Sequence, residues 1–175
     1  MNGKSIRPIF WGIMSTAVAA VCLVESGSAQ ERDRQTRVAD FSAAAGNALD
    51  AMVKEAKSRG MKGVAVVAFV PGDEVDRWSS QMRVVDAFVQ GNANLLAIAH
   101  CKLCEMADTL KDSGSKVRPP LHGELGYRGG AIRRLPTGYI LAAFSGGKDA
   151  DDLVVATIGL DSLEKAVSGS PGQTE

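Results

Sequence analysis

Apolar residues recur three and four positions apart in three stretches of the chain, and this spacing is typical of amphipathic helices. It predicts helices over residues 36–59, 94–110 and 149–167. Gly60 is a natural end for the first of these, because glycine commonly follows the last helical residue. Residues 115–125 contain two adjacent prolines and predict an irregular connection after the second helix.

The remaining apolar segments predict strands. Residues 63–70 are apolar at every position, which is typical of a strand buried on both faces. Residues 75–85 are mixed and predict a partly exposed second strand. Residues 131–135 and 139–144 flank a Pro-Thr-Gly turn and predict a hairpin. The order lacks a regular βαβ alternation, so it favours an α+β fold, with helices packed against an antiparallel sheet.

The N-terminal segment has the pattern of a secretory signal peptide. Lys4 and Arg7 precede an apolar run over residues 9–24, and small residues follow up to Ala29. The alternative is an uncleaved membrane anchor, but the run is shorter than the ~20 residues that a spanning helix needs. We therefore expect a signal peptide over residues 1–29, a secreted or periplasmic location, and no stable membrane anchor after cleavage.

The rest of the chain predicts a single domain. We expect a short linker over residues 30–35, the domain over residues 36–167 and a loose tail over residues 168–175. The 20 basic side chains of the whole chain balance its 20 acidic ones. Proteins that bind the phosphate backbone normally carry a basic excess, so we expect no nucleic-acid partner.

A Cys-x-x-Cys pair provides the first candidate chemistry. Cys101 and Cys104 share a flank of the second predicted helix with His100. Three interpretations remain open: an idle or structural thiol pair, a metal or haem site that uses these three residues, and a thiol redox pair. Covalent c-type haem requires His directly after the second Cys, where this chain has Glu105. A zinc site would need a fourth ligand, and His122 is the only other histidine.

The glycine-rich segment over residues 144–149 joins the hairpin to the last helix. Such a turn can bind anions through backbone N–H groups at the helix N-terminus. It is similar to the Ser-Gly-Gly-x-Asp-Ser loop of ATP pyrophosphatases, although Ala150 stands where that loop ends in Ser. A plain strand-to-helix turn is the favoured interpretation.

The second half of the chain also carries a family signature. Its parts are Gly129-Gly130, the segment over residues 138–147 and an early acid in the last helix, Asp152. Upstream, the buried strand, Arg83 and Lys102 follow in the same order as in the family. Over about residues 36–167 the chain resembles the GlcG/HbpS-like haem-binding family, which also includes the PduO C-terminal domain type. Ala131, Leu103 and Arg133 depart from the family pattern.

The resemblance implies a profilin-like antiparallel sheet flanked by helices, a possible homo-oligomer, and haem or a corrinoid as the cofactor in some members. If haem binds, His100, Cys104 and His122 are the ligands to test, because imidazole and thiolate are common donors to haem iron. The resemblance does not transfer this ligand set residue by residue.

The function that we expect is an exported domain that binds a small ligand, haem or a related tetrapyrrole, for uptake, storage or sensing. The alternatives are a haem-degrading or thiol-redox enzyme, and an interaction domain without a small ligand. No Ser-His-Asp order, no paired carboxylates at helical spacing on a pocket face and no metalloprotease motif supports catalysis, so we predict no catalytic residue and do not favour an enzyme.

Overall fold

The computed structural model describes residues 16–168. The chain divides into two units, one up to Gln35 and one from Thr36 onward. Helix α1 (Thr16–Ser58) begins in the first unit, so residues 30–35 are helical where we expected a linker. The first 15 residues of the predicted signal peptide and residues 169–175 of the predicted tail lie outside the described residues. No described helix is long and apolar enough to cross a membrane.

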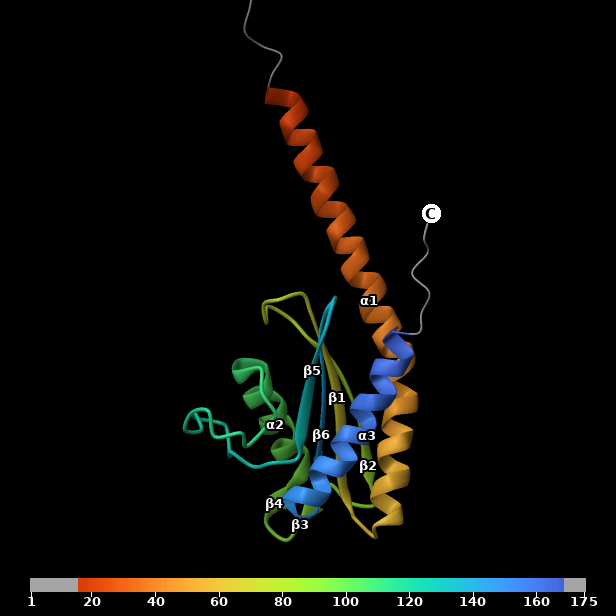
Figure 1. Ribbon diagram of the computed structural model, residues 1–175, viewed down its shortest axis with the longest axis vertical. Coiled ribbons are helices and arrows are strands. Elements are labelled where there is room, and N and C mark those ends of the chain that lie inside the picture. The colour runs from red at the N-terminus through yellow and green to blue at the C-terminus, as the bar shows by residue number, and fades with distance from the viewer. Residues whose placement is uncertain (1–15, 169–175) are drawn as a thin grey trace, which may run out of the picture. The chain divides into compact units, whose positions relative to one another are not determined.

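The second unit contains a four-stranded antiparallel sheet in the order β2-β1-β6-β5 (Figure 1). Its strands are β1 (Gly63–Pro71), β2 (Ser79–Val85), β5 (Gly130–Leu135) and β6 (Gly138–Ser145). Two further helices, α2 (Leu95–Thr109) and α3 (Asp149–Ser168), pack against it, and a two-residue pair, β3 (Val89–Gln90) and β4 (Ala93–Asn94), precedes α2. The predicted α+β class, a profilin-like antiparallel sheet flanked by helices, is confirmed.

The sheet separates two apolar cores because successive side chains of a strand point to opposite faces. On one face, Ala65, Val67 and Phe69 of β1 pack against the second part of α1 and against α3. On the other face, the alternate β1 residues, such as Val64 and Val66, pack against α2. All nine residues of β1 are buried, which explains why its sequence is apolar at every position. Figure 1 shows α2 on one side of the sheet and α3 on the other.

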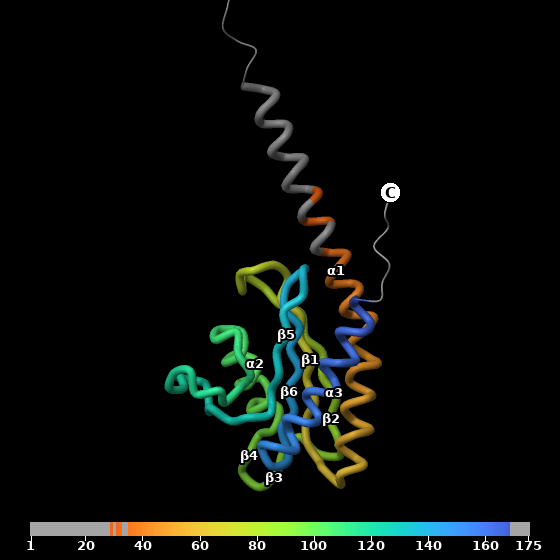
Figure 2. The backbone as a smooth tube through the Cα atoms, viewed as in Figure 1, coloured from red at the N-terminus to blue at the C-terminus, as the bar shows by residue number. Residues whose placement is uncertain are grey.

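Apart from α1, which begins at Thr16 and not at the predicted residue 36, the predicted elements recur with small shifts at their ends. The second strand begins at Ser79 instead of residue 75: the chain turns at Gly72, whose φ is +82°, and stays bent or irregular through residue 78. Helix α2 begins where the side chain of Asn94 accepts a hydrogen bond from the Ala97 N–H, a typical N-cap. The short β3–β4 pair had no signal in the sequence. Residues 110–129 run irregularly from α2 to β5, as expected for residues 115–125 (Figure 2).

Candidate functional site

A cavity of about 410 Å³ opens where α2, the β6–α3 turn and the loop before β5 come together. Its wall is partly apolar and partly charged. The lining residues are Gln90, Leu95, Ile98, Lys102, Tyr127, Ser145, Gly146, Gly147, Lys148, Asp149 and Asp152. Leu95, Ile98 and Lys102 lie on one face of α2, since they are separated by three and four positions. The helix therefore presents both apolar surface and one cation to the cavity.

A buried ion pair, Lys102–Asp152, joins α2 to the first turn of α3. The Lys102 Nζ lies 2.8 Å from Asp152 Oδ2 and donates a second hydrogen bond, of 2.6 Å, to the carbonyl oxygen of Phe144. Each of the two charged residues is only 3% exposed. The other carboxylate oxygen, Oδ1, accepts the N–H of Gly147 at 2.8 Å. These bonds link α2, the end of β6 and the start of α3 at a single point.

Two glycines leave the room that this ion pair needs. A Cβ on Gly129 would lie 2.6 Å from Lys102 Nζ and would also collide with Asp152 Cβ. The φ of Gly129 is +116°, a conformation that side chains other than glycine rarely adopt. A Cβ on Gly147 would collide with Met61 and approach Asp152 Oδ1 to 3.1 Å. Part of the Gly-Gly pattern therefore serves the packing of Lys102 and Asp152.

Burial dominates the electrostatics of the Asp152 carboxylate. Desolvation raises its pKa above the ordinary value, and the attraction of Lys102 and the Gly147 N–H offset only part of that effect. Because one Asp152 oxygen already accepts the Gly147 N–H, the glycine-rich turn uses this donor within the chain. The anion-binding capacity considered for this turn is reduced accordingly. At the rim, Lys148 and Asp149 are exposed.

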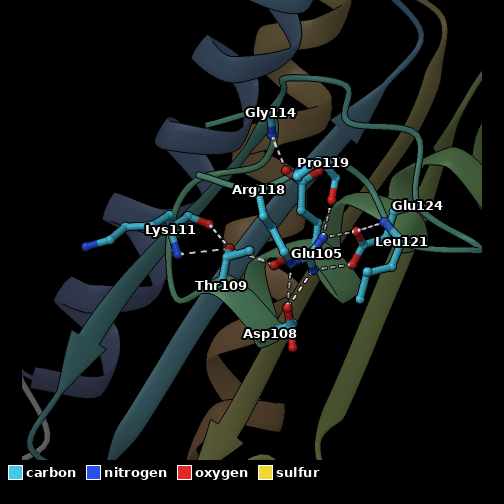
Figure 3. Close-up of polar contacts among 9 residues, drawn as sticks. All are labelled: Glu105, Asp108, Thr109, Lys111, Gly114, Arg118, Pro119, Leu121 and Glu124. Atoms are coloured by element: carbon cyan, nitrogen blue, oxygen red, sulfur yellow. Dashed lines mark hydrogen bonds and ion pairs between the residues drawn. The ribbon is translucent and has the colours of Figure 1, made fainter. Parts of the chain in front are cut away.

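A second polar cluster, the Arg118 clamp (Asp108, Arg118 and Glu124), holds the loop that leads to the cavity (Figure 3). Arg118 donates two hydrogen bonds to Glu124, of 2.6 and 2.8 Å, and two to Asp108. Glu124 also accepts the Leu121 N–H. These hydrogen bonds lower the pKa of Glu124 to about 2. The clamp lies close in sequence to Tyr127, the loop residue that lines the cavity.

Two further bonds tie this loop to the rest of the fold. The buried Glu105 carboxylate on α2 accepts the N–H of Gly114 at 2.8 Å (Figure 3). The Ser113 hydroxyl accepts the N–H of Gly130 at 2.8 Å, at the start of β5. A connection of this length would otherwise expose many unpaired backbone groups. The side chains therefore replace the hydrogen bonds that a helix or strand would supply.

The predicted ligand residues lie elsewhere. His100 is half-buried, and its Nδ1 donates to the carbonyl oxygen of Leu96 at 3.0 Å. Cys101 is half-buried and Cys104 is exposed, and both are free thiols. His122 lies exposed in the loop. None of these four residues lines the cavity. Within residues 16–168, no three His, Cys, Asp or Glu residues come together in a way that could hold a metal ion.

The cavity lining therefore includes none of the haem ligands that we expected. Among residues 16–168, the cavity lining contains no imidazole and no thiol, the two groups that the sequence suggested for iron ligation. Burial, and next the neighbouring Cys101, raise the pKa of the Cys104 thiol, with a further contribution from Glu124. A raised pKa lowers the fraction of thiolate, the form that binds metals.

Comparison of the chain with family models, with curated proteins and with solved structures gave no match. The resemblance to the GlcG/HbpS-like family therefore stays a prediction from the residues.

The sequence contained a signal for the buried pair that we did not use. Lys102 sits within the apolar stripe of α2, next to Leu103 and between Ala99 and Met106. A lysine at a core-facing position is rarely left without a partner of opposite charge. Asp152, in the first turn of the last helix, is such a partner, but nothing in the sequence alone places these two helices side by side.

Proposed function

We propose that the domain binds a small molecule in the cavity beside the Lys102–Asp152 pair. The observation that carries this proposal is the combination of a partly apolar wall with convergent polar groups in one concave site, the usual composition of a ligand pocket. The cavity volume of about 410 Å³ lies in the range of small-molecule sites, roughly 300 to 1,000 Å³.

The lining supports a ligand with one apolar and one polar end. Leu95, Ile98 and Tyr127 offer apolar surface, whereas Lys102 and Lys148 balance the formal charges of the two lining aspartates. The Lys102 ammonium group has three N–H donors, and two of them are used by Phe144 and Asp152. Because Lys102 lines the cavity, we propose that the third N–H donates to an oxygen of the ligand. A carbonyl, hydroxyl or carboxylate oxygen meets this requirement.

A cavity-filling variant tests the proposal. We would screen a mixture of small polar metabolites by ¹H–¹⁵N NMR against the wild-type chain and against Ile98→Trp, which places an indole in the cavity. Val84→Trp is the matched control, because Val84 is exposed on the sheet edge strand β2, outside the cavity lining. The expected result is binding to the wild type and the control, with amide shifts at Gly146 and Gly147, and no binding to Ile98→Trp. Equal binding to all three chains would refute the proposal.

Haem or a related tetrapyrrole remains the specific ligand that the family resemblance proposes. Because the predicted ligands His100, Cys104 and His122 lie outside the cavity lining, haem bound through them would occupy a different place from the cavity. Titration with haemin separates the two versions. Loss of the Soret shift in His100→Ala, Cys104→Ala or His122→Ala supports ligation at that residue, and loss in Ile98→Trp alone supports the cavity. No Soret shift in the wild type removes haem from the proposal.

We also propose that the chain is exported, on the basis of its N-terminal pattern. An exported product that begins at Gln30 would support cleavage after Ala29. Recovery of the uncleaved chain in the membrane fraction would favour the anchor.

A further inference from the structure

The Cys-x-x-Cys turn of α2 carries two thiols that are at least partly accessible to solvent, and between them two buried residues. Cys101 is half-buried and Cys104 is exposed, so the second thiol is open to solvent. The two residues between them, Lys102 and Leu103, are both buried. Lys102 is the residue that holds Asp152 and the Phe144 carbonyl. One helical turn therefore joins a solvent-accessible thiol to the ion pair beside the cavity.

The geometry allows the two sulfurs to meet only if this turn changes. Side chains three residues apart on a helix have Cβ atoms about 5 to 6 Å apart. A disulfide needs Cβ atoms about 3.5 to 4.5 Å apart. Closing the bond therefore requires the Cβ atoms to approach by roughly 1 to 2 Å. The backbone that must move includes Lys102.

We propose that Cys101 and Cys104 are a reversible thiol-modification site, and that disulfide formation there loosens the Lys102–Asp152 pair. The co-reactant is a small disulfide of the glutathione type. The Cys104 thiol is the more exposed one and reacts through its thiolate form, a smaller fraction because its pKa is raised. The thiolate attacks the small disulfide, forms a mixed disulfide and releases one reduced thiol. The Cys101 sulfur then displaces the second reduced thiol and closes the Cys101–Cys104 bond. Two protein thiols are oxidised, one small disulfide is reduced, and the two protons pass to the released thiols.

Disulfide formation should affect the cavity wall because Lys102 is hydrogen-bonded to Asp152, which is in turn hydrogen-bonded to Gly147. A shift of Lys102 weakens its bond to Asp152 Oδ2, and the Asp152 carboxylate then holds the Gly147 N–H less firmly. Gly147 and Lys102 both line the cavity. The oxidised chain should therefore have a less ordered cavity wall than the reduced chain. This inference does not depend on the identity of any ligand.

Mass spectrometry tests the first half of the proposal. The full chain carrying Cys22→Ser, which leaves only these two thiols, is treated with oxidised glutathione. Cyclisation lowers the mass by about 2 Da, the mass of two hydrogens. Trypsin cleaves after Lys102, between the two cysteines, so the disulfide keeps residues 84–102 and 103–111 joined until a reductant is added. A stable glutathione adduct on Cys104, without these joined peptides, would overturn the proposal.

Amide hydrogen exchange tests the second half. Exchange at Gly147 should become severalfold faster on oxidation and return to its original rate on reduction, while Ala142 in the centre of the sheet is unchanged. The control chain with Cys101→Ser and Cys104→Ser should show no response to the same reagent. A closed disulfide that leaves Gly147 exchange unchanged would refute the link to the ion pair. Because every readout is made without a ligand, failure here is distinguishable from failure of the cavity to bind one.

Discussion

The Lys102–Asp152 pair and the Arg118 clamp both join a basic side chain to carboxylates, but the first is buried and the second is part-buried. In the first, both side chains are almost fully buried, and desolvation raises the pKa of Asp152. In the second, Arg118 reaches solvent and donates four side-chain hydrogen bonds to its two acids, and the pKa of Glu124 falls to about 2. Burial thus has the largest effect on the pKa of Asp152, whereas hydrogen bonding has the largest effect on the pKa of Glu124.

The two clusters should contribute to stability in different ways. A buried pair gains little net stability relative to apolar side chains of similar size, but it is costly to break, because one charge is then left without a partner. The clamp is only part-buried, since the side chains of Arg118 and Asp108 are 24% and 57% exposed, so water screens it more than the buried pair and it contributes mainly by ordering its loop. We therefore expect the first cluster to control the cavity wall and the second to control the approach to it.

Breaking the buried pair should destabilise the protein most. Lys102→Met should lower the free energy of unfolding by about 3 to 5 kcal/mol, because Asp152 remains buried without its partner. Urea unfolding measures this loss. The double variant Lys102→Met/Asp152→Leu removes both charges and should recover most of it. A double variant as unstable as the single one would contradict the ion-pair account.

A smaller loss should follow Gly129→Ala. The added methyl group meets Lys102 and Asp152, and the backbone at φ +116° resists any side chain. We expect a loss of about 1 to 3 kcal/mol for the strained backbone alone, with the steric clash adding to it. Gly123→Ala is the matched control, since its φ is also positive, at +91°, but nothing lies within 4 Å of its Cβ. Equal losses in the two variants would show that the ion pair tolerates the methyl group.

The Arg118 clamp should appear in the dependence of stability on pH. The pKa of Glu124 in the folded state, about 2, is lower than its ordinary value of 4.5. Its contribution is therefore fully present above about pH 4.5 and is lost as the pH falls towards 2. The stability difference between the wild type and Glu124→Gln should shrink over that range in urea unfolding.

Asp152 should behave in the opposite sense. Its pKa is raised in the folded state, so ionisation costs stability as the pH rises from 3.8 through the folded-state value.

For the clamp, a stability difference between the wild type and Glu124→Gln that does not change between pH 4.5 and 2 would contradict the assignment.

The smallest effect is expected at an exposed pair with neither burial nor a clamp. Arg83 on β2 lies 3.8 Å from Asp50, and its side chain is 53% exposed. Arg83→Ala should change the free energy of unfolding by no more than about 0.5 kcal/mol. A loss above 1 kcal/mol would mean that this residue, which the family resemblance includes, has a partner or role beyond the ion pair.

The sequence predicted the elements better than the site, and the residues explain why. The apolar spacing of α2 and the continuous apolar run of β1 are local, so they could be read from neighbouring positions. The cavity depends on Lys102 and Asp152, which are 50 positions apart, and their proximity follows only from how α2 and α3 meet the end of β6.

The candidate ligands illustrate the same limit. His100 and Cys104 were chosen for their chemistry on one helix flank, but the cavity forms on the face that carries Leu95, Ile98 and Lys102. Local spacing defines which residues share a helix face. It does not define which face the rest of the fold leaves open.

The most direct test of a ligand-binding cavity is to determine where a bound compound lies. Intermolecular NOEs should be measured for the tightest-binding compound from the metabolite screen. A compound bound in the cavity should show contacts to the methyl groups of Leu95 and Ile98 and to the ring of Tyr127. Contacts instead to the exposed loop residues Leu121 and Leu125, near His122, would refute binding in the cavity.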